Sequence, residues 1–308
     1  MAQQRTIAEK ISCTGIGLHS GRPVELTLHP ARVDSGIVFV RSEGGRTVEI
    51  PAAAHQVSST RLATSIGRPG EEISTVEHLL AALYGLGIDN ARIELDGPEV
   101  PIMDGSAASF VFLIRAAGIF EQRAPRRMLR LRRAVEARAG EKWIRVEPAR
   151  SLRISYQIDF AHPGIGRQSI EGFELTPERF EREICRARTF GFLHEVQALW
   201  RSGLAQGGSL ENTIVLDESR VLNPEGLRMP DEFVRHKVLD LLGDFALLGL
   251  PLLAHVRVVR GGHALHQQLL ATLLSDPTNY EISMPTGWTP PFEAEAGRLG
   301  GVALRASA

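Results

Sequence analysis

Hydrophobic and polar positions alternate in the first hundred residues in a way that predicts strands and a buried helix. Residues 24–30 alternate apolar and polar side chains, and residues 91–95 form a second short run of this kind. Between these strands, apolar residues recur at helical spacing over residues 76–86, and Gly87 follows as a stop signal. Another helix with an apolar stripe is expected after Ser106. This half of the chain therefore mixes strands and helices.

The second half shows the same order of elements. Strands are expected near 143–146 and 152–159, and a long helix, a strand and a last helix are expected at 231–249, 252–259 and 263–274. In both halves a helix is followed by a glycine, a strand, a tight turn with glycine and a helix, the second turn being Gly261-Gly262. We therefore predict an α+β fold, in which an internal repeat forms two similar α+β domains packed face to face.

A basic stretch with proline, residues 123–133, predicts the boundary between the two domains. The first domain is expected to span residues 1–125 and the second 126–285. The last segment, 286–308, begins with several prolines and glycines, and we expect it to be a flexible tail.

Composition narrows the class of protein. The 308 residues are 43% hydrophobic and 23% charged, and 35 basic against 36 acidic residues give a net charge of −1. No overall basic field predicts a nucleic-acid partner. The two cysteines, Cys13 and Cys185, form no disulfide framework, which is typical of a reducing compartment. The N-terminus lacks the apolar core of a signal peptide, and the longest apolar run, 245–255, is broken by Gly249 and Pro251. We expect a cytoplasmic monomer without an integral membrane segment.

The helix predicted at 231–249 carries the first sign of chemistry. His236, Asp240 and Asp244 are spaced at i, i+4 and i+8, which places them on one face of a largely apolar helix. Buried charge is costly unless it is paired or bound to a metal. Taken alone, the pattern is better explained by a hydrogen-bonded His236–Asp240 pair in the core, with Asp244 meeting an arginine.

A second histidine, 158 residues upstream, changes this balance. His78 lies at the start of the matching helix of the first half, so packing of the two halves would bring it to His236. Two histidines and an aspartate are the three protein ligands of a catalytic zinc site. Glu77, beside His78, would then accept a proton from water. The alternative is a capping box, with Ser74 as N-cap and Glu77 three residues later. His263, at the start of the last helix, would donate a proton to a leaving amine, or would be an ordinary loop histidine.

The chain resembles the UDP-3-O-acyl-N-acetylglucosamine deacetylases, which are zinc amidases of lipid A synthesis. The resemblance extends over nearly the whole chain and is carried by long, ordered motifs. These motifs are residues 14–21, 73–79, 101–106, 186–192, 235–244 and 262–265.

The resemblance implies a role for each candidate residue. One zinc ion per chain would be bound by His78, His236 and Asp240, with Glu77 as general base. His263 would be the general acid or electrostatic stabiliser, positioned by Asp244. Thr189 would donate a hydrogen bond to the oxyanion. The remaining expected contacts to an acylated UDP-sugar are Lys237 and His19 at the substrate, and Lys142, Phe160 and Arg260 near the uridine diphosphate. Arg260 stands where the family often has lysine, which keeps the charge and changes its geometry.

The second domain would also contain an insert for passage of the acyl chain. Phe190 and Phe192, with Gly207, Gly208 and Ser209, would line an apolar groove in which glycine admits the chain close to the backbone. Core packing explains the two phenylalanines equally well without the resemblance.

Two other classes of protein remain as alternatives. In a binding module, the three metal ligands would form a structural zinc clamp between the halves, but such a site normally has a fourth protein ligand, and no cysteine or histidine at a suitable spacing supplies one. A metal-free RNA-binding protein is disfavoured by the neutral charge and by the absence of an aromatic stacking motif. The sequence therefore favours a zinc-dependent amidohydrolase.

Overall fold

A computed structural model describes residues 2–284, so the predicted flexible tail at 286–308 lies outside the described residues. Its helices are α1 (Glu77–Leu86), α2 (Ala108–Ala117), α3 (Pro177–Glu183), α4 (Leu193–Arg201), α5 (Glu232–Ala246) and α6 (His263–Leu274), with 3-10 turns η1 (Ala54–Gln56) and η2 (Pro277–Asn279). None of these helices combines the length and apolar character needed to cross a bilayer.

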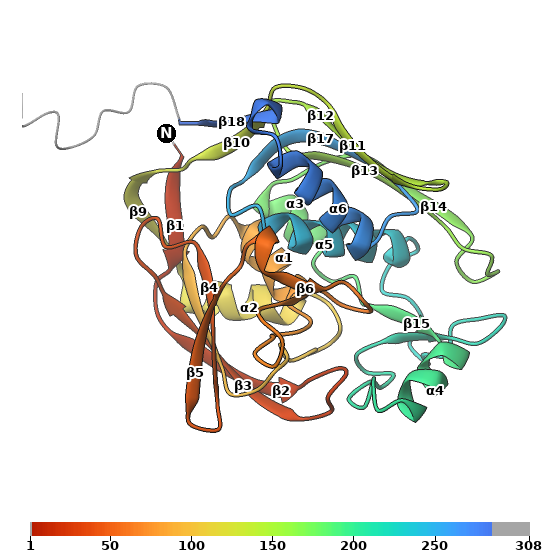
Figure 1. Ribbon diagram of the computed structural model, residues 1–308. Helices are drawn as coiled ribbons and strands as arrows, with labels where there is room; N and C mark the ends of the chain where they lie inside the picture. Colours follow the sequence, from red (N-terminus) through yellow and green to blue (C-terminus); the bar gives the residue numbers. More distant parts are fainter. Residues whose placement is uncertain (1, 285–308) are drawn as a thin grey trace, which may run out of the picture.

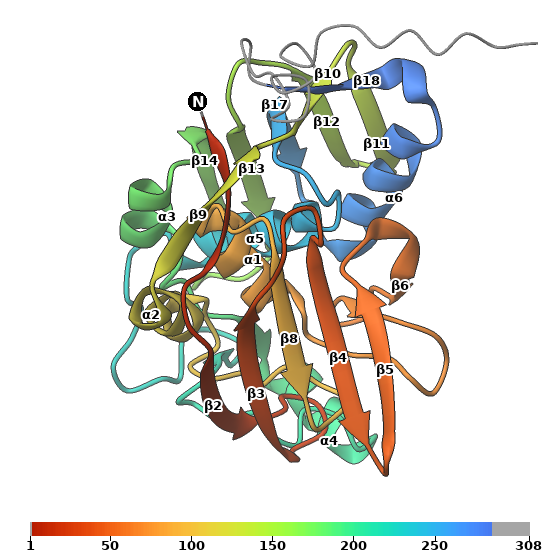
Figure 2. The ribbon, with the colours of Figure 1, turned by 90° about the vertical axis from the view of Figure 1, so that its left-hand side faces the viewer.

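Two larger sheets enclose the helices α1 and α5, as both views show (Figure 1, Figure 2). The strands of the first sheet are β2 (Ile11–Ile16), β3 (Pro23–Pro30), β4 (Ile37–Glu43), β5 (Arg46–Pro51) and β8 (Ala91–Leu95). Those of the second are β10 (Met128–Leu131), β11 (Val135–Ala139), β12 (Lys142–Pro148), β13 (Arg153–Asp159), β14 (Arg167–Glu174), β17 (Leu252–Val259) and β18 (Tyr280–Ser283). Shorter pairs are β1 (Gln3–Ile7) with β9 (Ile119–Pro125), β6 (Val57–Ser59) with β7 (Ser65–Ile66), and β15 (Phe190–Phe192) with β16 (Ile214–Leu216).

The two sheets share one pattern of strand pairing. In the first, β8 is antiparallel to β3 and parallel to β4, and the outer strands β2 and β5 pair antiparallel with β3 and β4. In the second, β17 is antiparallel to β12 and parallel to β13, with β11 and β14 outside them. The order of elements that repeats in the sequence therefore also repeats in the pairing. The fold is α+β, as predicted.

Side-chain alternation explains which face of each sheet is buried. In β3, Val24, Leu26 and Leu28 are buried, and the residues between them are more exposed. Successive side chains of a strand point to opposite faces, so one face joins the core while the other meets solvent. In α1, by contrast, every residue except Tyr84 is buried, because the helix lies between the sheets and against α5. Gly87 ends α1 in a left-handed conformation (φ 73°), as the sequence predicts.

The tight Gly261-Gly262 turn is present, but neither glycine is there to adopt a left-handed conformation. The left-handed residue is Arg260 (φ 54°), whereas Gly262 is extended. Gly261 is required by space, because a Cβ there would lie 2.4 Å from Val258 and 2.8 Å from the Tyr156 hydroxyl. The turn is therefore tight through close packing against β13, and it leads directly into α6.

Candidate active site

The site lies where α1 and α5 pack against each other at close range. Gly243 is in the interior of α5, where glycine is unfavourable for a helix. A Cβ at this position would lie 2.0 Å from the carbonyl oxygen of Glu77, the first residue of α1. The missing side chain lets the two backbones approach, and this brings Glu77 and His78 against the polar face of α5.

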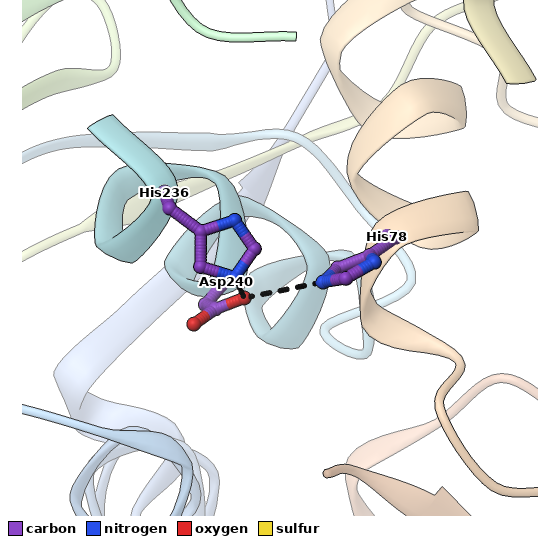
Figure 3. Close-up of side chains that lie close together, drawn as sticks. All are labelled: His78, His236 and Asp240. Atoms are coloured by element: carbon purple, nitrogen blue, oxygen red, sulfur yellow. Dashed lines mark ion pairs between the residues drawn. The ribbon is translucent and has the colours of Figure 1, made fainter. Parts of the chain in front are cut away.

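Three side chains form a group that could hold a metal ion. His78 extends from α1, and His236 and Asp240 extend from successive turns of α5 (Figure 3). One ligand atom from each lies within 4.8 Å of the others, and all three residues are buried. Asp240 Oδ1 is 3.3 Å from His236 Nε2 and 3.7 Å from His78 Nε2. The ligand atoms converge on one small volume, as a coordination sphere requires.

The protonation of the group also fits a metal. Burial lowers the pKa of His78 to about 4 and that of His236 to about 3, so both rings are neutral near pH 7. His236 Nδ1 donates to the carbonyl of Ala187 at 3.0 Å, which leaves the Nε2 lone pair free. Burial raises the pKa of Asp240, but nearby positive charges, including those of Lys237 and His263, outweigh burial and hold this pKa well below its ordinary value.

Glu77 lies beside this group, and its pKa is raised, whereas those of the three candidate ligands are lowered. Burial is the main cause that raises its pKa to about 7. One of its carboxylate oxygens accepts a hydrogen bond from the backbone N–H of Thr64 at 3.1 Å, and the other lies 3.7 Å from His263 Nε2. A carboxylate with a pKa near neutrality is suited to accept and return a proton.

His263 faces Glu77 across the site and is held from behind by Asp244. Its Nδ1 donates to Asp244 Oδ2 at 2.7 Å, so its Nε2 points to Glu77 and Asp240. Burial lowers its pKa, but the three carboxylates of Asp244, Glu77 and Asp240 outweigh burial and raise the pKa to about 10. His263 is therefore an imidazolium near pH 7, a group that can donate a proton.

Sequence reasoning missed two residues that hold Asp244. The Thr64 hydroxyl donates to Asp244 Oδ1 at 2.6 Å, and His266 Nδ1 donates to Oδ2 at 2.7 Å. His266 Nε2 faces the Tyr156 hydroxyl at 3.3 Å. Thr64 lies in an irregular loop, and no pattern in the sequence marks it. His266 did have a signal, because it is one turn along α6 from His263 and therefore shares its face.

The capping box expected from Ser74 and Glu77 is wrong. The N-cap of α1 is Val76, and no side chain caps it. The Ser74 hydroxyl instead accepts a hydrogen bond from Ser65, and the Glu77 carboxylate turns into the site. Since the Glu77 side chain does not cap the N-terminus of α1, the capping box no longer explains this residue without a chemical role.

A cavity of about 370 Å³ opens beside the metal group. Its wall is mainly apolar, and of the expected substrate residues it includes His19, Thr189, Phe190, Gly208 and Ser209. Much of the remaining wall comes from α4, whose apolar residues Leu193, Val196, Leu199 and Trp200 face the cavity. A long apolar group fits such a wall better than a polar one.

Two residues of the expected apolar groove are not in the cavity wall. Phe192 packs instead on Phe160 and His162, with ring centroids 6.1 Å and 5.4 Å away. Gly207 is needed for packing, since a Cβ there would lie 2.3 Å from the carbonyl oxygen of Gly17. Glycine at this position therefore allows two loops to approach each other. Because Gly207 does not line the cavity, the cavity gives no support to the expectation that it admits an acyl chain.

Of the other expected substrate residues, Lys237 contacts the metal group directly, whereas Lys142, Phe160 and Arg260 lie on or next to strands of the second sheet. Lys237 donates to Asp240 Oδ2 at 2.7 Å, and its ammonium lies 5.2 Å from the centroid of the Phe190 ring. Lys142 and Arg260 lie at one end of the adjacent strands β12 and β17, where Arg260 pairs with Glu141 at 2.9 Å. Phe160 links this end to the site, because its ring packs against Phe190 at 5.7 Å.

His19 reaches the cavity from a loop after β2. Its backbone N–H donates to the buried Glu99 at 2.9 Å, which fixes the loop. Both ring nitrogens are buried, and among the described residues neither has a hydrogen-bond partner. Burial lowers the pKa of the ring. An imidazole in this state can bond to a polar group of a bound molecule, as unpaired buried polar atoms require a partner.

Comparison with known proteins identifies the family. The family model for UDP-3-O-acyl N-acetylglycosamine deacetylase matches residues 4–275. The chain belongs to this family. A UDP-3-O-acyl-N-acetylglucosamine deacetylase of Myxococcus xanthus (strain DK1622) is 55% identical over 279 residues, 91% of this chain and 88% of the relative. Proteins of the same name from Anaeromyxobacter dehalogenans (strain 2CP-C) and Anaeromyxobacter sp. (strain Fw109-5) are 51% and 53% identical, each covering at least 91% of both chains.

Family membership confirms the resemblance inferred from the motifs. It makes the chain a deacetylase, a hydrolase that acts on an amide. The geometry is compatible with this chemistry, because a group that could hold a metal lies between a carboxylate with a raised pKa and a protonated histidine.

Proposed function

We propose that this protein is a zinc-dependent deacetylase of lipid A biosynthesis, which removes the N-acetyl group from a UDP-3-O-(3-hydroxyacyl)-N-acetylglucosamine. Water attacks the acetyl carbon, and acetate and the free amine leave. The observation that carries the proposal is the convergence of His78, His236 and Asp240 within 4.8 Å, flanked by Glu77 and His263. The names of the family and its relatives give the substrate.

One zinc ion per chain would be held by His78, His236 and Asp240. Two neutral imidazoles and one carboxylate are a donor set that zinc accepts, with a position left for water or substrate. Bound there, zinc would polarise the acetyl carbonyl and lower the pKa of water. A structural clamp is less well supported, because the group that could hold the ion contains three residues and not four among those described.

Glu77 and His263 would move the protons. Glu77, with a pKa of about 7, takes a proton from the attacking water, since a base is most effective when its pKa is near the working pH. His263 carries its proton on the Nε2 that faces the site, so it stabilises the oxyanion and then protonates the leaving amine. Asp244 keeps His263 charged and correctly oriented.

Thr189 and Lys237 would complete the binding of the reacting group. Thr189 lies in the cavity wall beside Phe190, where its hydroxyl donates to the oxyanion on the acetyl carbon. The Lys237 ammonium lies next to Asp240 and would meet the polar part of the sugar. His19, with two unpartnered ring nitrogens among the described residues, would bond to the substrate from the other side of the cavity.

The acyl chain and the nucleotide would occupy different regions. The acyl chain would lie in the apolar cavity, against Phe190, Gly208 and Ser209 and the apolar face of α4. The uridine diphosphate would lie near Lys142, Phe160 and Arg260, where two cationic side chains suit a diphosphate. Phe192, which packs on Phe160, would support this second region.

The remaining features of the proposal follow from the sequence. The protein would act in the cytoplasm as a monomer, with domains at 1–125 and 126–285, the second carrying the acyl-passage insert. It would bind no nucleic acid, since the net charge is −1.

Incubation with UDP-3-O-(3-hydroxyacyl)-N-acetylglucosamine tests the proposal directly. We expect mass spectrometry to show loss of one acetyl group with purified protein containing about one zinc per chain. His236→Ala should lose both zinc and turnover, because a ligand and the metal depend on each other. Full activity after exhaustive chelation, with no metal in the sample, would refute zinc dependence. Turnover without loss of acetate would refute the reaction.

A further inference from the structure

A buried ion pair joins the start of α5 to the segment before β15. The side chains of Arg188 and Glu232 are 2% and 0% exposed, and Arg188 Nε donates to Glu232 Oε1 at 2.9 Å. Removing two charges from water has a large desolvation cost, so a buried ion pair often contributes less to stability than apolar residues of similar volume. Stability alone is therefore a weak reason for this pair.

The pair is the centre of a dense set of hydrogen bonds. Besides the Arg188 side chain, Glu232 Oε1 accepts the backbone N–H of Arg188 at 3.0 Å, and Oε2 accepts that of Arg228 at 2.6 Å. The rest of the Arg188 guanidinium donates to Glu225 at 2.6 Å and to the carbonyl of Gly226 at 2.8 Å. Because Glu232 is the first residue of α5, these bonds fix the beginning of that helix relative to the backbone of Arg188.

The two neighbours of Arg188 both belong to the proposed site. The carbonyl of Ala187 accepts from His236 Nδ1 at 3.0 Å, and His236 is one helical turn after Glu232. On the other side, Thr189 lies in the cavity wall, and its N–H donates to the carbonyl of Gly105 at 2.8 Å. A shift of Arg188 along α5 would therefore move both the carbonyl that orients His236 and the hydroxyl of Thr189.

We propose that Arg188 and Glu232 are positioning residues that hold the Ala187 carbonyl against His236. This contact keeps the proton of His236 on Nδ1 and leaves Nε2 free to bind the metal. Partners of metal-binding histidines commonly determine the tautomer and orientation of the ring. The inference rests on the proposed metal site, and it adds two residues that touch neither metal nor substrate.

The test compares Glu232→Gln with a matched variant, Asp89→Asn. Glutamine keeps the size of Glu232 and removes its charge. Asp89 forms another largely buried pair, with Arg126 at 2.7 Å, and accepts the N–H of Arg5, so it also joins distant segments. Within residues 2–284, the hydrogen-bond and ion-pair partners of the Asp89 side chain are Arg5 and Arg126, which lie outside the proposed site. Both variants should lower Tm, because each removes a carboxylate that pairs with an arginine and accepts a backbone N–H.

The decisive measurement is the dissociation constant for zinc, obtained by competition with a chelator on folded protein. We expect Glu232→Gln to bind zinc about 10-fold or more weakly, as loss of such a partner does elsewhere, and Asp89→Asn to bind it as the wild type does. Imidazole ¹⁵N spectra of the metal-free protein should show less of the Nδ1–H tautomer of His236 in Glu232→Gln. An unchanged dissociation constant and an unchanged tautomer, with only a lower Tm, would overturn the proposal.

If Glu232→Gln does not fold, a double variant still tests the proposal. Arg188→Met with Glu232→Met removes both charges, a change that folded proteins often tolerate. If the double variant folds and binds zinc as tightly as the wild type, the pair has no positioning role. If it folds and binds zinc about 10-fold more weakly, the role is supported. Absence of zinc binding in the wild type would instead refute the metal site itself, and the positioning role with it.

Discussion

Glu77 and Asp244 are both buried carboxylates, yet their pKa values differ by several units. Burial dominates for Glu77, whose pKa rises to about 7. For Asp244, burial raises the pKa, but the charge of His263 and hydrogen bonds from His263 and His266 outweigh it and lower the pKa to about 2. Two carboxylates in one site can therefore do different work, one exchanging a proton and the other remaining an anion.

Glu77→Gln should retain zinc and lose most of the deacetylation rate. Glutamine has the same size but cannot accept a proton, and a positioned general base contributes roughly 10²–10⁴-fold. Turnover measured with equal zinc content in both proteins checks this. Since Glu77 makes no capping box, a rate near that of the wild type would mean that another group removes the proton.

The same variant should change how the stability of the metal-free protein depends on pH. A carboxyl group whose pKa rises from 4.5 to about 7 on folding binds its proton more tightly in the folded state. Its contribution to stability therefore falls as pH rises from 4.5 to 7, by about 3 kcal/mol at most. Glu77→Gln lacks this titration, so its Tm should fall less than that of the wild type between pH 5 and 8.

Glu9→Gln, a change on the surface, is the control and should follow the wild type. Parallel Tm curves for Glu77→Gln and wild type would contradict the raised pKa.

Asp244→Asn should move the basic limb of the pH–rate profile to lower pH. The Asp244 carboxylate is the largest of the influences that raise the pKa of His263, and the active form of His263 is the protonated one. Loss of the negative charge lowers that pKa, so His263 loses its proton at a lower pH. We expect a displacement of about one pH unit or more in kcat/KM. An unmoved limb in a variant that still binds zinc would assign the limb to another group.

At the scale of elements, the site depends on the distance between α1 and α5. Gly243 sets this distance, since a Cβ at this position would lie 2.0 Å from the carbonyl oxygen of Glu77. The sequence did contain a signal, a glycine in the interior of an apolar helix, where alanine would be the better helix former. Such a glycine indicates close contact with another backbone, but the sequence does not say which one.

Gly243→Ala should therefore damage both the fold and the site. The added methyl group meets a carbonyl oxygen at 2.0 Å, and overpacking of this kind costs about 1–3 kcal/mol. Because the helices must move apart, His78 leaves His236, and zinc should bind about 10-fold or more weakly. Gly85→Ala is the matched control. Gly85 is on α1, as His78 is, and a Cβ there would crowd the Phe180 ring of α3 and not α5, so this change should lower Tm without weakening zinc binding. Equal zinc affinity in the two variants would contradict the proposed role of Gly243.

At the scale of the whole molecule, the cavity is assembled from segments that are distant in the sequence. Leu18 and Leu62 come from the first half of the chain, and α4 and the loop at Gly208 come from the second. The helix α4 has no fully buried residue, and its apolar residues Leu193, Val196, Leu199 and Trp200 border the cavity. We expect a bound acyl chain to complete the packing of α4.

Leu199→Asn should raise KM for substrates with a long acyl chain and leave kcat nearly unchanged. An unpaired amide in the apolar wall must lose its water when the chain binds, which costs about 1–3 kcal/mol, or roughly 10- to 100-fold in KM. A substrate with a short acyl group should be affected little. Ala198→Asn is the control, because Ala198 is exposed and is not in the cavity wall. A similar rise in KM for short and long chains would place the acyl group elsewhere.

The sequence alone determined the features that depend on local spacing. Alternation predicted the strands that became β3, β8 and β17, and helical periodicity predicted α5 and α6. The i, i+4, i+8 spacing placed His236, Asp240 and Asp244 on one face of α5, because helix geometry fixes that relation. The repeated order of elements predicted the repeated pairing of the two sheets. The domain boundary at 125 stays a prediction.

Only the tertiary structure decided which distant groups meet. The repeated order of elements predicted that His78 approaches His236. It did not predict the bonds from Thr64 and His266 to Asp244 or the Ala187 carbonyl behind His236, because the spacing of these segments in the chain carries no information about contact. The pKa values of about 7 for Glu77 and about 10 for His263 are likewise properties of the folded protein, since they arise from burial and from charges on other elements. A local rule also failed here. Ser74 and Glu77 have the spacing of a capping box, but Ser74 accepts a hydrogen bond from Ser65 and Glu77 accepts one from the backbone N–H of Thr64, and these contacts replace the local one.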